Sequence, residues 1–377
     1  MSKRRQMLTG RQRASGLSLI EILVALGLGL VLIAGATNLF IGSSQTFRAN
    51  ESYSRMQEES RFAFNRLQRD GRSAGFRSCS SNRVNLLNNA GSGDLDEQLW
   101  FDLPVMGWEF DDTGPDSDDV FEIENFDLPA DGDSWSNGAG GLHPSLVGNV
   151  VRGTDVLVLS GTRRLGVNVA GVTINPNNVT IDLGAAANIG QNDLFMISDT
   201  DCSAGNLVQK RNQANDRITI SAGGNNPGNS QASLTYTPNL GIEILQIQTR
   251  AYFVGMSDGE PALFTQRLEP NGGAAQELIR GVENMQVLYG VAGGSNAVSA
   301  TQYVPADNVN DWSDVVSVRL ALLLRSPDNS NPDTNTRTYN LLGLEVDPTP
   351  DTAAGPGGDR RLRVLATQTI GLRNRLR

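Results

Sequence analysis

The sequence predicts an α+β protein, in which one long N-terminal hydrophobic helix precedes an antiparallel β-sheet head with long loops. The first observation is that no charged residue occurs from Ile22 to Phe47. The second is that short apolar segments follow Cys79, separated by loops rich in glycine, asparagine and proline. The third is a hydrophobic content of 39%, which is sufficient for a packed core in a chain of 377 residues.

The N-terminal residues 1–16 form a basic leader that contains no acid. Its cations are Lys3, Arg4, Arg5, Arg11 and Arg13. At ~1.5 Å per residue, the uncharged run that follows is long enough to cross a hydrocarbon core of ~30 Å, so residues 17–42 are expected to lie in the membrane. Glu21 stands just before this run. Because a carboxylate in lipid is costly, Glu21 is expected to have a specific role.

Three kinds of N-terminal segment compete to explain this composition. A secretory signal peptide would be cut near Ala34-Gly35-Ala36 and release a protein that begins near Thr37, but the apolar run is long for one. An uncleaved anchor with its basic end in the cytoplasm explains the leader but leaves Glu21 unexplained. A leader that is cut after Gly16 explains the basic residues, the glycine, Glu21 and the long helix together, and the sequence favours it.

The segment Gly16-Leu17-Ser18-Leu19-Ile20-Glu21 resembles the cleavage signature of type IV prepilins, in which a Gly precedes the cut and a Glu is fifth in the mature chain. The resemblance implies that prepilin peptidase cuts after Gly16 and that the amine of Leu17 is methylated. It also implies that Glu21 pairs with the free amine of a neighbouring subunit when the filament grows. Leu17 and Ser18 stand where many pilins have Phe and Thr.

The pilin-like helix is expected to continue beyond the membrane and to end near residue 75. Its expected buried stripe has three- and four-residue steps: Tyr53, Met56, Ser60, Ala63 and Leu67. Its expected surface ion pairs are Glu51–Arg55 and Arg66–Asp70. Residues 17–75 would thus form the transmembrane or filament-core helix with its periplasmic extension, and residues 76–377 a β-rich periplasmic head.

Short β-strands are predicted throughout this head by period-two alternation and by apolar runs bounded by turn residues. They are expected at 154–160, 179–183, 193–198, 217–220, 243–254 and 314–325. The last segment ends in a leucine-rich run, which is typical of a buried central strand. The longest loops are expected at 223–228, 326–336 and 347–359.

Cys79 and Cys202 are the two cysteines of the chain. Both follow the apolar run, on the side that the basic leader assigns to the periplasm. A disulfide is the expected pairing in that oxidising space, and it would contribute roughly 4–5 kcal/mol in the chain-entropy model. The alternatives are two buried thiols or a metal site. A metal is disfavoured because His143 is the one histidine and no CxxC spacing occurs.

Three further segments are similar to PilW-type minor pilins: Arg72–Cys79, Trp312–Ser326, and the end from Arg360 to Arg375. The resemblance implies a minor pilin that joins other minor pilins in a complex that initiates or tips type IV pilus assembly, serving twitching motility, adhesion or DNA uptake. The implied partners are prepilin peptidase, the major and other minor pilins, and the inner-membrane assembly platform. The implied location is a single pass of the inner membrane with a periplasmic head, followed by incorporation into the pilus.

Two other functions remain open at this point. The first is a minor pseudopilin of a type II secretion system, which would share both the leader and the helix. The second is an anchored or released periplasmic binding protein. The net charge of −10, which becomes more negative without the leader, argues against nucleic acid as a main partner.

Residues 84–151 form an acidic segment, expected as an insertion in the head, that holds fifteen acids and no Lys or Arg. With Trp100, Trp108 and Trp135 it could dock a basic partner or bind calcium. The interpretation that we favour is a solvated insertion whose tryptophans belong to an ordinary core. An EF-hand spacing begins at Asp131-Gly132-Asp133 but is broken at Trp135.

The C-terminus is basic, with no acid after Asp359. Its cations are Arg360, Arg361, Arg363, Arg373, Arg375 and Arg377. They could contact an acidic neighbour or a DNA backbone, but protection of an edge strand is favoured. His143 and Lys210, the one lysine beyond the leader, lie in no catalytic pattern, and no Walker loop or nucleophile elbow occurs. The sequence therefore predicts a protein that is not an enzyme and has no cofactor and no metal.

Overall fold

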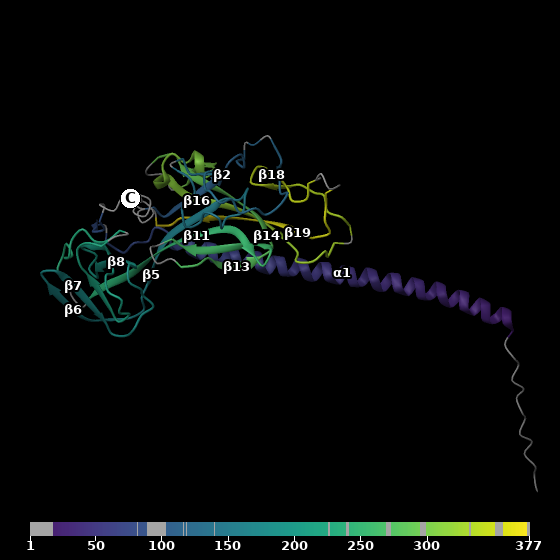
Figure 1. Cartoon of the computed structure of the whole chain (residues 1–377), viewed down its shortest axis with the longest axis horizontal. Helices are drawn as coiled ribbons and strands as arrows, with labels where there is room; N and C mark the ends of the chain where they lie inside the picture. The colour runs from purple at the N-terminus through teal and green to yellow at the C-terminus, as the bar shows by residue number, and fades with distance from the viewer. Residues whose placement is uncertain are drawn as a thin grey trace, which may run out of the picture. The chain divides into compact units, whose positions relative to one another are not determined.

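The computed structural model divides into two compact units, residues 1–51 and residues 52–377. The residues that it describes are 18–80, 82–88, 103–115, 117, 119–138, 140–224, 227–238, 241–268, 273–294, 299–331, 333–350 and 357–374. One long apolar helix, α1 (Leu19–Ser73), precedes a mostly β region with several sheets (Figure 1). The predicted α+β order of helix first and strands second is therefore observed.

The part of α1 in the second unit packs one face against the sheets. Its buried residues recur at three- and four-residue steps: Met56, Ser60, Ala63, Phe64, Leu67 and Gly71. The prediction that Tyr53 belongs to this buried stripe is wrong, because its side chain is 48% exposed. The Arg66–Asp70 pair is confirmed at 3.3 Å, whereas Arg55 pairs with Glu59 at 2.9 Å instead of Glu51.

The largest sheet among the described residues has nine strands. Seven follow one path, β1 (Arg83–Asn85), β9 (Gly205–Gln209), β8 (Leu194–Asp199), β11 (Ile242–Ser257), β5 (Val156–Arg164), β2 (Val105–Phe110) and β4 (Trp135–Ser136). The other two are β12 (Glu260–Arg267), which pairs with β11, and β13 (Gln276–Arg280), which pairs with β12. The long strand β11 organises this sheet, because its first half pairs with β8 and its second half with β12.

Three smaller sheets complete the described strands. One has the order β10 (Arg217–Ile220), β7 (Asn178–Leu183), β6 (Val169–Asn175). A four-stranded sheet has the order β15 (Ala300–Val304), β14 (Val282–Ala292), β16 (Val315–Arg325), β19 (Arg363–Gly371). The last has the order β17 (Tyr339–Leu341), β18 (Leu344–Asp347), β3 (Phe121–Glu122). Short 3₁₀ turns occur at Ala306–Asn308 and Trp312–Asp314.

All six predicted strands are confirmed, as β5, β7, β8, β10, β11 and β16. The prediction that 314–325 is a central strand is also confirmed, since β16 lies between β14 and β19 and is largely buried. The expectation of antiparallel pairing needs one correction. The β1–β9 and β18–β3 ladders are parallel, and the other ladders of the described strands are antiparallel.

The main hydrophobic core joins α1 to two sheets. Met56, Ala63 and Leu67 of the helix share one cluster of buried residues with Leu159 of β5 and Leu320 of β16. Because apolar burial is the dominant favourable term in folding, this cluster fixes the second half of the helix on the head.

The acidic segment contributes strands to the fold as well as loops. The whole of β2 is buried and pairs with β5 of the large sheet. Trp108 and Trp135 are buried core residues, as expected, and Trp100 lies outside the described residues. The segment is therefore more than a solvated insertion, because its middle forms part of a sheet.

Candidate functional site

The residues expected for N-terminal processing are Gly16 and Leu17, and both lie outside the described residues. Glu21 is described and occupies the first turn of α1, where its side chain is exposed. Its backbone N–H donates to the carbonyl of Ser18 at 3.0 Å.

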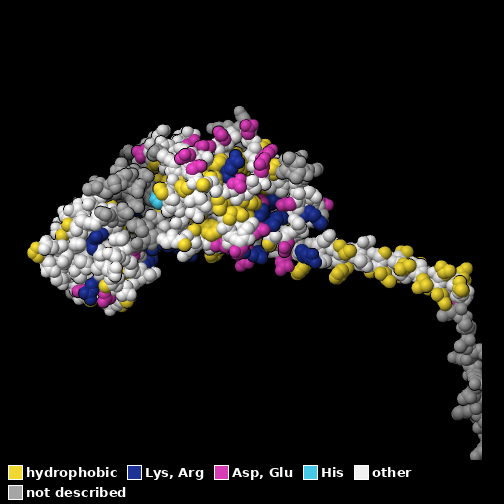
Figure 2. Space-filling view, in the orientation of Figure 1, with side chains coloured by type: hydrophobic (Ala, Val, Ile, Leu, Met, Phe, Trp, Pro, Cys, Tyr) yellow, Lys and Arg dark blue, Asp and Glu magenta, His cyan; other side chains and the backbone are white. Residues whose placement is uncertain are grey.

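The first half of α1 exposes a continuous series of large apolar side chains (Figure 2). They include Leu23, Val24, Leu26, Leu28, Leu30, Val31, Leu32 and Ile33. By length and composition α1 could cross a membrane, and no residue of its most apolar 18-residue stretch is buried. Because so much exposed apolar surface is unusual in a soluble protein, this half of the helix has the composition of a segment that lies in lipid or against other apolar helices.

Asp70 forms a polar joint between the end of α1 and the large sheet. Its carboxylate accepts a hydrogen bond from the hydroxyl of Tyr252 on β11 and lies 3.3 Å from Nε of Arg66. Nε of Arg250, also on β11, is 3.8 Å away. Burial and the negative charge of Asp70 raise the pKa of the Tyr252 hydroxyl, which stays protonated and can donate. The joint fixes the helix end by directed contacts in addition to apolar packing.

The three PilW-like segments meet in space. A Cβ atom on Gly71 would lie 2.6 Å from Cγ2 of Ile370, so the last strand β19 approaches the helix very closely. Gly75 has a φ of +77°, and a Cβ there would lie 1.9 Å from the carbonyl oxygen of Asn374. The segment after α1 therefore touches the C-terminal segment, which in turn pairs with the middle segment through the β16–β19 ladder.

A disulfide joins Cys79 and Cys202, with the two Cα atoms 5.3 Å apart and 123 residues between them in sequence. Cys79 follows the helix, and Cys202 lies in the turn between β8 and β9 with a φ of +63°. The bond ties the segment after α1 to the turn between β8 and β9 of the large sheet.

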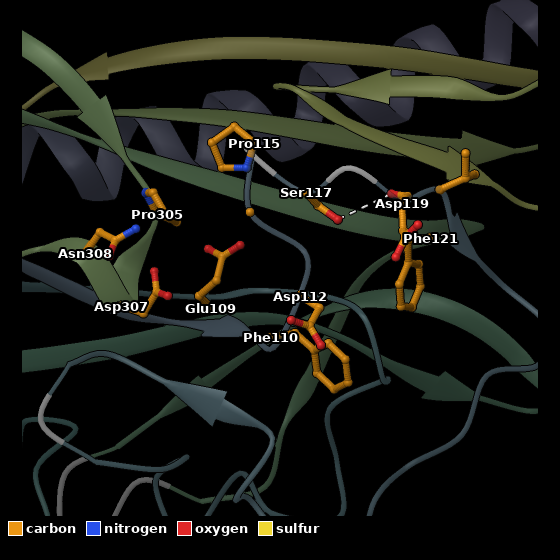
Figure 3. A pocket seen from close by; sticks show the side chains of 12 residues that line it. Glu109, Phe110, Asp112, Pro115, Ser117, Asp119, Phe121, Pro305, Asp307 and Asn308 are labelled. Carbon is orange, nitrogen blue, oxygen red and sulfur yellow. Dashed lines mark hydrogen bonds between the residues drawn. The ribbon is translucent and has the colours of Figure 1, made fainter.

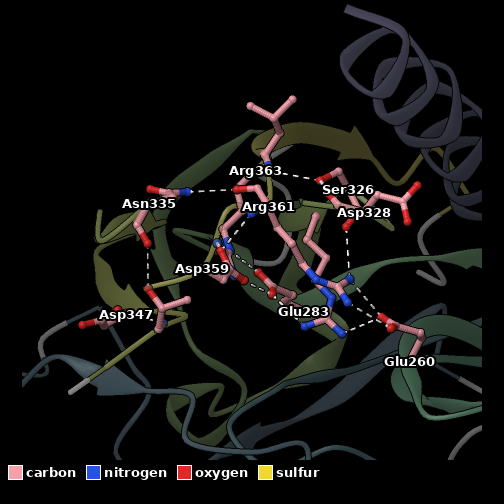
Figure 4. Close-up of polar contacts among 12 residues, drawn as sticks. Glu260, Glu283, Ser326, Asp328, Asn335, Asp347, Asp359, Arg361 and Arg363 are labelled. Atoms are coloured by element: carbon pink, nitrogen blue, oxygen red, sulfur yellow. Dashed lines mark hydrogen bonds and ion pairs between the residues drawn. The ribbon is translucent and has the colours of Figure 1, made fainter. Parts of the chain in front are cut away.

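A buried ion-pair network connects β12, β14, β16 and β19 (Figure 4). Arg363 of β19 donates to Glu283 of β14 at 2.7 Å and to Asp359 at 2.7 Å. Arg325 of β16 lies 3.1 Å from Glu283 and 2.6 Å from Glu260.

Arg361 completes the network with a 3.1 Å contact to Glu260. Although burial acts to raise the pKa of Glu260, hydrogen bonds from Arg361 and Arg325 outweigh it and hold that pKa below its usual value. The pKa of Asp359 is lowered in the same way by Arg363.

The network corrects the interpretation of the basic C-terminus. Internal carboxylates hold the guanidinium groups of Arg361 and Arg363, so these two side chains do not project freely into solvent. Arg360 is exposed and donates to the carbonyl of Asn331 at 2.9 Å. The alternation of Arg361 and Arg363 with Leu362 predicts that both arginines lie on the same face of the strand. Their partners Glu260 and Glu283 come from distant segments, which the sequence pattern does not connect to them.

His143 and Lys210 form no arrangement typical of a catalytic site. Nδ1 of His143 lies 2.7 Å from the hydroxyl of Ser145 in a turn. Lys210 is buried, its ammonium donates to the carbonyl of Asn212, and burial lowers its pKa. Within the described ranges, no group of three or more His, Cys, Asp or Glu side chains is arranged to hold a metal ion.

The model of the family Type IV Pilus-assembly protein W matches residues 251–374. This region contains the middle segment and most of the C-terminal segment that resemble PilW-type proteins, together with the whole ion-pair network. Neither the comparison with curated proteins nor that with solved structures found a match. The family match confirms the resemblance predicted from the sequence: residues 251–374 are similar to PilW-type pilus-assembly proteins.

Proposed function

We propose that this protein is a minor pilin, which joins other minor pilins in the complex that initiates or tips type IV pilus assembly. The observation that carries the proposal is the exposed apolar first half of α1, which holds Glu21 in its first turn and precedes a PilW-like region. The prepilin-like sequence from Gly16 to Glu21 supports the same function. In this proposal the helix crosses the inner membrane once and the head lies in the periplasm.

The proposed assembly chemistry follows from the cost of burying one charge. Prepilin peptidase would cut after Gly16 and leave an N-methylated amine on Leu17. In lipid or in a filament core, the carboxylate of Glu21 lacks water and is destabilising while it has no partner. The amine of a neighbouring subunit would supply that partner, so the free energy of the pair favours one axial stagger between subunits.

The head would supply the surfaces that recognise other pilus components. The Asp70 joint and the apolar cluster hold the head on the second half of α1, so the surfaces of the head and of that part of the helix would be presented together. The major pilin, other minor pilins and the inner-membrane platform are the proposed partners. The family match names pilus assembly, which favours this function over a pseudopilin of a secretion system.

Deletion and complementation test the proposal. Loss of surface pili with normal protein secretion is expected on deletion, and the full chain should restore pili. A Glu21→Gln variant should be processed but enter pili poorly, whereas Glu51→Gln, which removes an acid further along the same helix, should restore pili fully. Loss of secreted enzymes with intact pili would contradict the proposal and indicate a pseudopilin.

A further inference from the structure

An acidic pocket of about 580 Å³ lies on the head, where the end of β2 and the loop after it meet the 3₁₀ turn Ala306–Asn308 (Figure 3). The described residues that line it include four acids: Glu109, Asp112, Asp119 and Asp307. No described Lys or Arg lines it. The pocket lies within the second unit of the chain.

Glu109 forms the floor of this acidic pocket. The residue is 4% exposed, and Figure 3 shows its carboxylate directed into the space between Asp307 and Pro115. One carboxylate oxygen accepts from the hydroxyl of Thr113 at 3.3 Å, but Oε2 has no hydrogen-bond partner. A buried polar atom without a partner is destabilising by roughly 1–3 kcal/mol, and more if it is charged. The floor of the pocket therefore presents an acceptor that a ligand could satisfy.

The surroundings make this acceptor selective for a cation. Asp155 lies behind the floor, fully buried, and accepts hydrogen bonds from the backbone N–H groups of Phe110 and Val287. Burial first, and then the neighbouring acids Asp155 and Asp307, raise the pKa of Glu109 well above its usual value. A positive group in the pocket would offset this repulsion and favour the ionised carboxylate.

The walls of the pocket indicate which cation fits. They are formed by Phe110, Phe121, Pro115 and Pro305, so an apolar stem or a flat cation could pack between them. A bare metal ion gains nothing from such walls, and the described acids form no three-ligand group for one. A guanidinium, in contrast, combines an aliphatic stem with five donors in a planar fork.

We propose that the acidic pocket receives an arginine side chain from a neighbouring protein subunit, with its guanidinium against Glu109 and Asp307. That the arginine comes from another pilus subunit rests on the proposed role in pilus assembly. The recognition of a guanidinium by the acidic pocket does not depend on that role. The aliphatic stem packs between the proline and phenylalanine walls, and the free Oε2 of Glu109 accepts an N–H of the guanidinium.

Saturation-transfer NMR on the full-length protein in detergent micelles tests the proposal, with N-acetyl-L-arginine amide as the probe. The arginine probe should receive saturation, and its neutral isostere N-acetyl-L-citrulline amide should receive little. Glu109→Gln and Asp307→Asn should each reduce the arginine signal at least threefold. Asp131→Asn, which removes an equal charge at an exposed position of the acidic segment, should leave the signal unchanged. Asp307 is itself exposed, so its variant should fold normally.

Three results would overturn the proposal. Equal signals from the arginine and citrulline probes would exclude charge recognition, and equal losses in all three variants would indicate general attraction to an acidic surface. Displacement of the arginine probe by micromolar Ca²⁺, lost in Glu109→Gln, would assign the site to a metal ion. None of these results depends on N-terminal processing or filament formation, so the pocket can fail while the proposed pilin function stands.

Discussion

Arg363 and Glu283 form an almost completely buried ion pair, with side chains 1% and 0% exposed and Nε of the arginine 2.7 Å from a carboxylate oxygen. The pair joins β19 to β14 across the intervening strand β16. Arg325 of β16 contacts the same carboxylate at 3.1 Å, so one glutamate serves two guanidinium groups on two strands. The network therefore fixes the C-terminal strand within the region that matches the pilus-assembly family.

Glu283→Gln should be strongly destabilising, because it leaves Arg363 and Arg325 without their shared counter-charge in the interior. Breaking a buried pair by removing one partner costs about 3–5 kcal/mol. Asp258→Asn is the control, since it removes an acid whose side chain is 80% exposed beside Arg280, and exposed pairs contribute under about 1 kcal/mol. The measurement is the free energy of unfolding from urea titration in detergent. A loss for Glu283→Gln no larger than that of the control would show that the network contributes little.

The stability of the head should depend on pH through Asp155. Burial raises the pKa of this carboxyl to about 8. Since the unfolded chain has a carboxyl pKa near ~3.9, the folded state holds a proton that the unfolded state has lost between about pH 4 and pH 8. The contribution of Asp155 to the free energy of unfolding therefore decreases as the pH rises through that window.

Asp155→Asn should reduce this pH dependence, as measured by urea titrations at pH 5, 6, 7 and 8. Asp131→Asn should keep the slope of the parent protein. Glu109 contributes with the same sign, because its pKa is also raised, whereas the lowered pKa values of Glu260 and Asp359 act in the opposite sense at more acidic pH. If the free energy of unfolding of Asp155→Asn had the same pH dependence as that of the parent protein, Asp155 would not be the source of that dependence.

The packing of α1 on the head should depend on Leu67. Its side chain is fully buried in the main cluster, whereas Phe62, on another face of the same helix, is 55% exposed. Leu67→Ala should be destabilising by about 2–5 kcal/mol through lost burial and a residual cavity. Phe62→Ala should change the free energy of unfolding by less than about 1 kcal/mol. Equal effects of the two substitutions would show that the helix is not packed as described.

The Cys79–Cys202 disulfide should contribute to stability by restricting the unfolded chain. Replacing both cysteines with serine should lower the free energy of unfolding by about 2–5 kcal/mol. Dithiothreitol should lower the urea midpoint of the parent protein but leave that of the double variant unchanged. A parent protein whose midpoint is insensitive to the reductant, with two free thiols by mass, would show that the bond does not form.

Local sequence patterns predicted the long helix and six strands, because periodicity and apolar runs report directly on which face of an element is buried. The stripe predicted on α1 included Tyr53, whose side chain is exposed, and omitted Phe64, which is buried. The choice of Glu59 over Glu51 as the partner of Arg55 could not be predicted, because both stand at i±4 on the same helix.

The polar sites of the head could not be predicted from the sequence and were identified only from the structure. Glu260 is 101 residues from Arg361 in sequence, and Glu283 is 80 residues from Arg363. The sheets bring each pair together, and no spacing in the sequence predicts the pairing. In the same way, Glu109 belongs to the acidic segment but meets Asp307 through a turn far along the chain. Composition showed that the segment was acidic, but only the fold showed which acids converge.

The most direct test of the central claim is the mass of the N-terminal peptide of the protein from membranes and from sheared surface filaments. The expected peptide begins at Leu17, carries one methyl group and is present in both fractions. A peptide that begins at Met1, or one that begins near Thr37, would contradict the assignment of the chain as a processed minor pilin.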